Sequence, residues 1–266
     1  MPNLTLWLGV ISAGAILGWS LFQPGASRNI MDLHGLVVVL GGAAAAMLIS
    51  TPAAQLFGAL RAVGWVLNPG RVPSPEEIAA EIARLSRLAH AQGGLLALRD
   101  ESADFAGGFL QRSIAAAAAC GETASARQIL ELEVRRRRIA RQEEANVFRT
   151  LGTLAPMFGL MGTLLGMLKV LTNMSEPTKL GPAMALALSS AFVGIGLANL
   201  FCVPMAGQVR LLSMRETQAL EMLIEGVLAI AMNQPTYQVE LRMGAYLDAP
   251  AAAAGKPGAG AVREPA

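Results

Sequence analysis

Four long apolar stretches separate the polar parts of this chain. The first runs from Leu4 to Phe22 and the second from about Leu33 to Thr51. The third and fourth, Leu151–Leu168 and Leu180–Val209, are joined by the short polar link Lys169–Lys179. Each is close to the roughly 20 apolar residues that a helix needs to cross the hydrocarbon core of a bilayer. The pattern predicts four transmembrane helices arranged as two hairpins, residues 1–52 and 151–209.

The polar segment 53–150 between the hairpins has hydrophobic positions that follow a helical period. Ser74 precedes Pro75 and two acids, which is typical of a helix start. Apolar residues then recur at three- and four-residue steps until Gly93–Gly94 breaks the helix. A second helix should end at Gly121. A third, Ser125–Arg149, should run directly into the third apolar stretch.

The chain after Val209 also reads as helical. An amphipathic helix is expected up to Gln234, with Glu216 among its apolar residues and reaching out to water or to a nearby Lys or Arg. A short helix should cover Val239–Leu247, which completes a C-terminal region 210–248. Residues 249–266 are rich in Ala, Pro and Gly and are predicted to be disordered. Because no β pattern occurs, we predict an all-α fold with four transmembrane helices and a helical cytoplasmic domain.

Composition supports a membrane environment. The chain is 53% hydrophobic and only 15% charged, and its mean hydropathy is +0.47, whereas soluble domains usually carry about 25% charged residues. The net charge of +2 argues against a nucleic-acid partner.

The positions of Lys and Arg predict the orientation in the membrane. Of 21 such residues, 13 lie in segment 52–150 and five follow Pro204, whereas the two short links hold three. The positive-inside rule therefore places the long segment and both termini in the cytoplasm.

Residues for enzymatic chemistry are scarce. Neither a Cys or His cluster with metal-ligand spacing nor a phosphate-binding loop occurs, and the two histidines lie far apart. The two cysteines fall in very different segments, so a disulfide is not expected. We predict that the chain is not an enzyme and holds no metal or other cofactor.

Small residues and prolines mark the second hairpin. Pro156 and Pro204 each remove a backbone hydrogen bond and create either a hinge or a static kink. Glycines spaced three and four residues apart allow close helix packing. These are Gly159, Gly162 and Gly166, with Gly194 and Gly196 repeating the theme.

The membrane segments contain hydroxyls and an amide but no acid. The polar residues of the second hairpin are Thr153, Thr163, Ser189, Ser190 and Asn199. Such hydroxyls either bond to their own backbone or line a path for a cation. An ion path normally needs an intramembrane carboxylate, so a partner would have to supply it.

Several motifs resemble one family. The stretches LAPMFGLMGTLLGML (154–168) and GPAMALALSSAFVGIGLANLFCVPMA (181–206) resemble the third and fourth spans of the MotA/PomA stator subunits of the bacterial flagellar motor. The link SEPTKLGP and the C-terminal EGVLAIAMNQP also fit, and the resemblance covers about residues 4–248. It implies a pentameric ring around two copies of a MotB-like, single-span subunit, anchored to peptidoglycan. That partner supplies the ion-carrying Asp, and ion flow makes the ring turn a FliG-like rotor for motility and chemotaxis.

The resemblance also implies roles for single residues. Pro156 and Pro204 would couple ion binding to movement. Thr163, Ser190 and Ala191 match ion-pathway positions at which sodium-driven members carry threonine. Because Ala191 departs from that pattern, the transported ion can be H⁺ or Na⁺.

One departure concerns the rotor contact. Flagellar members end a G-x-L-x-L-E stretch in a rotor-facing glutamate, but GGLLALR (93–99) places Arg99 at the acid position. The candidate contact residues here are Arg87, His90, Arg99, Asp100 and Glu101. Altered charges change the choice of partner.

Two alternatives remain open at this stage. A stator-like subunit could energise gliding or a TolQ/ExbB-type transfer of energy to the outer membrane, although that group has a single span before its large cytoplasmic segment. A scaffold or a transporter would be a different class, and a transporter would be expected to show an internal polar binding site.

Overall fold

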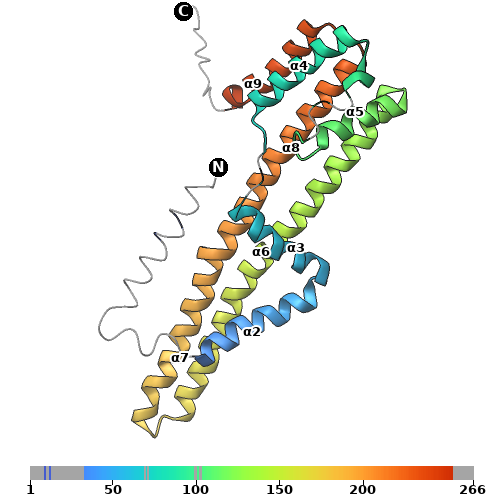
Figure 1. Ribbon diagram of the computed structural model, residues 1–266. Helices are drawn as coiled ribbons and strands as arrows, with labels where there is room; N and C mark the ends of the chain where they lie inside the picture. The colour runs from blue at the N-terminus through green and yellow to red at the C-terminus, as the bar shows by residue number, and fades with distance from the viewer. Residues whose placement is uncertain are drawn as a thin grey trace, which may run out of the picture. The chain divides into compact units, whose positions relative to one another are not determined.

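The computed structural model describes residues 33–68, 70, 72–98, 101 and 104–253, together with Gly9 and Ser12 (Figure 1). The predicted first span and the chain after residue 253 lie outside the described residues. Every described element is helical. The elements are α2 (Leu33–Ser50), α3 (Ala53–Leu67), α4 (Pro75–Gln92), the 3-10 helix η1 (Leu95–Leu98), α5 (Phe109–Cys120), α6 (Thr123–Thr172), α7 (Pro177–Gly196), the π-helix η2 (Leu197–Cys202), α8 (Val203–Ala231) and α9 (Thr236–Ala253).

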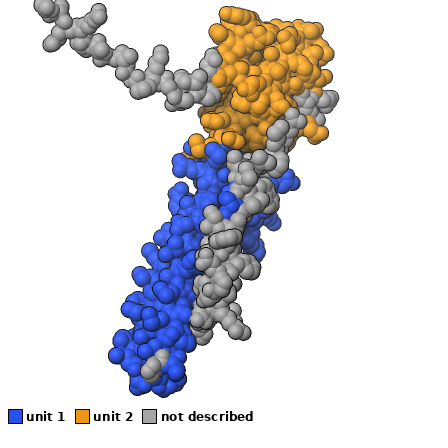
Figure 2. Space-filling model, turned by 90° about the vertical axis from the view of Figure 1, so that its left-hand side faces the viewer, with its two compact units in different colours: residues 1–70, 138–213 blue, residues 71–137, 214–266 orange. Residues whose placement is uncertain are grey.

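The chain divides into two compact units (Figure 2). Unit 1 comprises residues 1–70 and 138–213, and unit 2 comprises residues 71–137 and 214–266. We expected residues 53–150 to form one domain, but α3 and the residues from Arg138 onward group with unit 1. The two units are defined by contacts within the chain and not by position in a membrane. The boundaries of the membrane spans and of the cytoplasmic domain therefore stay predictions.

Helix α4 of unit 2 begins and ends where the sequence indicates. The Ser74 hydroxyl accepts a hydrogen bond from the Glu77 N–H (3.2 Å), and the Glu77 carboxylate accepts one from the Ser74 N–H (3.0 Å). This capping box satisfies two backbone donors that the first turn would leave unpaired. Gly93 ends the helix in the left-handed conformation (φ 89°), which costs glycine little.

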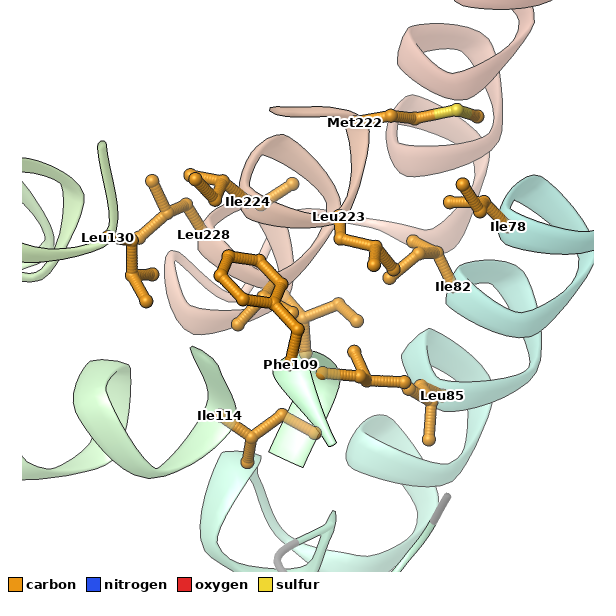
Figure 3. Close-up of a cluster of buried hydrophobic side chains, with 14 of the residues drawn as sticks. Ile78, Ile82, Leu85, Phe109, Ile114, Leu130, Met222, Leu223, Ile224 and Leu228 are labelled. Carbon is orange, nitrogen blue, oxygen red and sulfur yellow. The ribbon is translucent and has the colours of Figure 1, made fainter. Parts of the chain in front are cut away.

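The core of unit 2 forms where α4, α5, α6, α8 and α9 meet (Figure 3). Phe109 is fully buried at the start of α5, where burial contributes roughly 1.5–3 kcal/mol. The Arg112 and Arg137 guanidinium carbons lie 5.9 Å and 5.5 Å from the centroid of its ring. Helix α8 approaches α4 closely at Gly226, where a Cβ would lie 2.7 Å from the Ile82 side chain.

Ion pairs link the helices of unit 2 at the edge of this core. The Glu225 carboxylate of α8 lies 2.5 Å from Arg127 of α6 and 3.9 Å from Arg242 of α9. The hydrogen bond that the Arg127 guanidinium donates to Glu225 raises the pKa of Arg127 above its usual value. Glu216, which the helical pattern places among apolar residues, lies 3.7 Å from Arg137. The expectation that Glu216 reaches a nearby basic side chain is therefore confirmed.

Helix α6 is 50 residues long, which corresponds to roughly 75 Å. The prediction that the third polar helix runs without a break into the third apolar stretch is confirmed. The link to α7 is shorter than expected, because α6 continues to Thr172 and α7 begins at Pro177. Proline at the first helical position favours this start, and Lys179 pairs with Glu176 at 2.7 Å.

In unit 1, α2 packs against α7. Three residues of α2 that are spaced one turn apart, Val39, Ala43 and Met47, are buried. Gly42 leaves room for the ring of Phe158, which a Cβ at this position would overlap. Buried side chains of α2, α3, α6 and α8 form a second hydrophobic cluster. At its edge the Arg141 guanidinium lies 3.9 Å from the Trp65 ring centroid and 2.9 Å from Glu144.

Helix α9 also differs from the sequence-based expectation. We expected a short helix that ends at Leu247 and a disordered tail from residue 249, but α9 runs to Ala253. The alanines beyond Asp248 have the highest helix propensity of all residues and favour the extension, whereas Pro250 among them disfavours it. The absence of order after residue 253 stays a prediction.

Candidate functional site

Helices α6 and α7 meet along a line of small residues, which we call the glycine seam: Gly159, Gly162 and Gly166 of α6, with Ala187, Ser190 and Gly194 of α7. A Cβ on Gly159 would lie 3.0 Å from the Ser190 carbonyl oxygen. A Cβ on Gly162 would lie 2.5 Å from the Ser190 Cβ, and one on Gly166 would lie 2.6 Å from the Ala187 Cβ. The two backbones therefore approach as closely as glycine allows, as in other small-residue helix pairs in membranes.

The seam extends toward the prolines. A Cβ on Gly194 would lie 2.6 Å from the carbonyl oxygen of Ala155, the residue before Pro156. Gly152, whose carbonyl loses its α-helical donor because Pro156 has no N–H, faces the Cys202 side chain of η2. Gly196, expected to repeat the packing theme, has no atom of another element within 4 Å of a built Cβ. That position is not part of the seam.

Pro204 has a different setting from Pro156. Pro156 lies inside the continuous helix α6, whereas Pro204 follows the π-helix η2 at the second position of α8. The Val203 N–H donates to the Ala198 carbonyl, five residues back. The widened turn changes the hydrogen-bond register just before the proline. The expectation that Pro204 interrupts a regular α-helix therefore needs correction, while its coupling role stays a prediction.

The predicted ion-pathway residues lie on and beside the seam. Ser190 is fully buried, and its hydroxyl lies 2.9 Å from the carbonyl oxygens of both Leu186 and Ala187. Thr163 follows Gly162, is half-buried, and donates to the Leu160 carbonyl at 2.6 Å. Ala191 lies against Gly159. Both hydroxyl hydrogens are used within their own helices, so only the oxygen lone pairs remain to contact a cation.

The other polar side chains of this region also bond to their own backbone. Ser189 donates to the Leu186 carbonyl, and Thr153 donates to the Arg149 carbonyl. The Asn199 amide donates to Ile195 at 3.2 Å and is exposed. All five polar side chains of the second hairpin thus bond to their own backbone, which is one of the two interpretations that the sequence left open; the other was a path for a cation. Within the described ranges no group of three or more His, Cys, Asp or Glu residues could hold a metal ion.

The residues expected at the rotor contact have partners inside unit 2. Arg87 lies 3.6 Å from Glu240 of α9, and His90 Nδ1 donates to the Ser86 carbonyl at 2.8 Å. Glu101 lies 3.0 Å from Arg84. The hydrogen bonds that Arg84 donates to Glu81 and Glu101 raise the pKa of Arg84 above its usual value. Arg99 and Asp100 lie outside the described residues.

One exposed residue near this contact was not predicted. Leu96 of η1 is 74% exposed, directly after the two glycines with positive φ. The apolar spacing that led to the interpretation of segment 53–150 gave no sign of it, because a single leucine in a polar turn has no period. Only the structure identifies Leu96, through its exposure next to the predicted contact residues.

The described helices include two that are long and apolar enough, by length and composition, to cross a membrane: Thr123–Thr172 and Thr178–Ala231. Val37–Ser50 and Ala53–Leu67 are shorter apolar helices. These lengths, the glycine seam and the charge-free segments 151–168 and 180–209 define an all-helical membrane protein.

Comparisons with known proteins show what this chain is similar to within this class. The model of the MotA/TolQ/ExbB proton channel family matches residues 101–222. This match includes the third and fourth apolar stretches, and it confirms the resemblance drawn from them. Because the family consists of proton channels, the prediction that the chain is not an enzyme is confirmed as well.

Named relatives cover nearly the whole chain. The Chemotaxis protein PomA of Vibrio alginolyticus is 28% identical over 92% of this chain and 96% of its own length. Motility protein A of Cereibacter sphaeroides is 27% identical over 91% and 94%. The fold is similar to that in the structure of the flagellar MotAB stator complex from Bacillus subtilis, with a TM-score of 0.81 and 24% identity over 93% of this chain and 97% of that one.

Proposed function

We propose that this chain is a MotA-like stator subunit that forms a cation channel with a MotB-like partner and uses ion flow to drive rotation. The observation that carries the proposal is the α6–α7 pair. It combines a glycine seam, buried or half-buried hydroxyls and two prolines with no Asp, Glu, Lys, Arg or His in segments 151–168 and 180–209. The similarity to PomA and to Motility protein A over more than nine-tenths of the chain supports it.

The absence of an acid determines what the partner must supply. A titrating group in the membrane is normally a carboxylate, and these two segments contain none. The partner would bring an Asp on a single span, anchored to peptidoglycan at its other end. Thr163 and Ser190 then offer oxygen lone pairs close to that Asp, while Ala191 offers none. Oxygen donors suit Na⁺ and also a hydrated proton path, so the driving ion is H⁺ or Na⁺.

The proposed assembly is a ring, by analogy a pentamer, in the bacterial inner membrane. Four spans would place both termini in the cytoplasm, with residues 4–22 as the first span. Helix α6 presents exposed leucines opposite the seam, among them Leu160, Leu164 and Leu171. In hydrocarbon such a face needs no water and can contact lipid or a neighbouring protein helix.

The proposed rotor contact lies in unit 2, around the turn that follows α4. Arg87, His90 and Glu101, together with Arg99 and Asp100, would present charges to a FliG-like rotor protein. Because Arg87 and Glu101 already have intramolecular partners, a rotor would have to compete with these pairs. Exposed pairs of this kind contribute about 0–1 kcal/mol each, so the competition is weak.

Co-purification tests the proposal directly. The chain is co-expressed with a MotB-like single-span protein from the same organism, purified in mild detergent and studied by native mass spectrometry. We expect several copies of this chain around two copies of the partner. A chain that never binds a partner with a membrane carboxylate would contradict the ion-driven function.

A second candidate is a stator-like subunit that powers a non-flagellar process, such as gliding or TolQ/ExbB-type energy transfer. Arg99 at the usual acid position favours it, because it alters the charge pattern presented to a rotor. Deleting the gene separates the two functions. Loss of swimming with an intact outer membrane supports the flagellar function, and the reverse phenotype supports the alternative.

A further inference from the structure

Unit 1 contains a groove at the end of α6 that precedes the link to α7. Its volume is about 340 Å³. The walls are apolar and come from three helices: Val38 of α2, Gly162, Leu165 and Leu168 of α6, and Leu186 of α7. Lys169 and Thr172 supply the polar part of the lining.

The polar part of the lining carries one available positive charge. The neighbouring acid Glu176 pairs with Lys179, and no ion pair involves Lys169 in the described part of the chain. The Thr172 hydroxyl donates to the carbonyls of Leu168 and Lys169, both at 3.1 Å. Its oxygen is therefore left as an acceptor. The groove offers one cation, one hydroxyl acceptor and a hydrocarbon-like wall.

The glycine seam keeps the apolar part of the groove open. Gly162 belongs to both features, and its missing side chain cannot be replaced without meeting Ser190. A larger residue could fill this part of the groove only by separating α6 from α7. The space is therefore a consequence of the same close approach that forms the seam.

We propose that this groove is a binding site for an anionic phospholipid, with an acyl chain against the leucine wall and the phosphate on Lys169. A phosphate next to the ammonium satisfies a charge that has no protein partner, and attraction of this kind is worth about 1 kcal/mol per basic residue. A headgroup hydroxyl, as in phosphatidylglycerol, can donate to the Thr172 oxygen. A zwitterionic lipid adds its own ammonium beside Lys169 and fits less well. The inference requires only that the chain spans a bilayer and does not depend on the motor function.

The test compares lipid retention in matched variants of the full chain. Each protein is reconstituted into nanodiscs of phosphatidylglycerol and phosphatidylethanolamine in equal amounts, extracted in mild detergent and measured by native mass spectrometry. We expect the wild type to retain phosphatidylglycerol in preference. Lys169→Gln should reduce that preference about fivefold. Lys179→Gln removes the same charge outside the groove and should leave it unchanged.

A second variant tests the apolar wall. Leu165→Trp fills the groove while keeping the charge, and it should lower retention of both lipids if its elution and melting temperature match the wild type. Adding glycerol 3-phosphate should not displace the bound lipid, because it lacks the acyl chain. Displacement by this soluble headgroup would show a simple phosphate site and would overturn the proposal.

Three further outcomes would overturn the inference. Equal retention by Lys169→Gln and the wild type would mean that the lipid binds elsewhere. Equal losses in both lysine variants would mean attraction to the surface charge in general. The third outcome combines two results: the single-span partner displaces the lipid on co-purification, and the lysine variants without the partner retain the same lipid as the wild type. This outcome would mean that the groove binds a protein helix.

Discussion

Gly162 leaves no room for a side chain. A methyl group there would lie 2.5 Å from the Ser190 Cβ, well inside van der Waals contact, so Gly162→Ala must separate α6 and α7 or shift a backbone. We expect a loss of stability of about 1–3 kcal/mol, measured as thermal unfolding of the purified chain in detergent. Gly196→Ala is the control, because nothing lies near its Cβ position. Equal melting temperatures for both variants would mean that the seam does not hold the helices together.

The Thr163 hydroxyl provides a test of the ion path. Its hydrogen is bonded to the Leu160 carbonyl, so Thr163→Ala removes an oxygen acceptor but little packing. If this oxygen contacts the ion, swimming speed should change its dependence on sodium or on pH. Thr172→Ala removes a hydroxyl bonded in the same way near the end of α6 and should leave that dependence unchanged. Identical curves for both variants would assign Thr163 to packing alone.

The sequence predicts the interactions of a single residue only where its partner lies within about one helical turn of it. Hydroxyls in a helix can always reach a carbonyl one turn back, so the backbone bonds of Ser190 and Thr163 were foreseeable. The ion pair of Arg127 and Glu225 was not, because these residues are 98 positions apart. Nothing in the local pattern brings them together.

At the scale of elements, Pro156 is the position at which a continuous membrane helix lacks a hydrogen bond. Pro156→Ala should restore that bond and stiffen α6. We expect normal assembly with the partner but no swimming, because the hinge and not the packing is changed. Pro182→Ala, in α7, is the matched control and should swim normally. Wild-type motility in the Pro156 variant would remove the coupling role.

The regular elements were largely predictable, and the exceptions have physical reasons. The α4 cap and its break at Gly93 follow from side-chain chemistry that the sequence shows directly. The π-helix η2 could not be predicted in this way. It depends on the hydrogen-bond register before Pro204, and its apolar spacing is nearly the same as that of an α-helix. The link after α6 came out shorter than expected because polar residues such as Lys169 and Thr172 still fit a helix end.

At the scale of the whole molecule, the ion pairs of Glu225 join three helices of unit 2. Glu225→Gln keeps the shape of the side chain and removes its charge. We expect a loss of about 1 kcal/mol, since the pair is partly exposed and screened by solvent. The exposed Glu221, one turn earlier, serves as the control in Glu221→Gln. The difference between the two melting temperatures should shrink at high salt, and a difference independent of salt would exclude an electrostatic origin.

The rotor interface is tested by reversing one charge. Arg99→Glu restores the acid that flagellar relatives of this type carry at the end of the stretch. Swimming speed should change while the amount of chain in the membrane stays constant, because the residue lies outside the apolar segments. Arg61→Glu is a control of equal charge in a different unit. Indifference of swimming to Arg99→Glu would show that this charge does not face a rotor.

The charge-free hairpin has a consequence for the order of biogenesis. A helix without acids enters the bilayer easily, whereas a carboxylate at its centre costs about 2.5–3.5 kcal/mol on insertion scales. We therefore expect this chain to insert without its partner and to conduct no ions alone, since segments 151–168 and 180–209 hold no carboxylate that could carry a proton. A cell that makes it in excess would not dissipate its membrane potential. An ion leak across the membrane could arise only once the subunit that carries the acid joins this chain. Expression of that subunit is therefore the step that needs control.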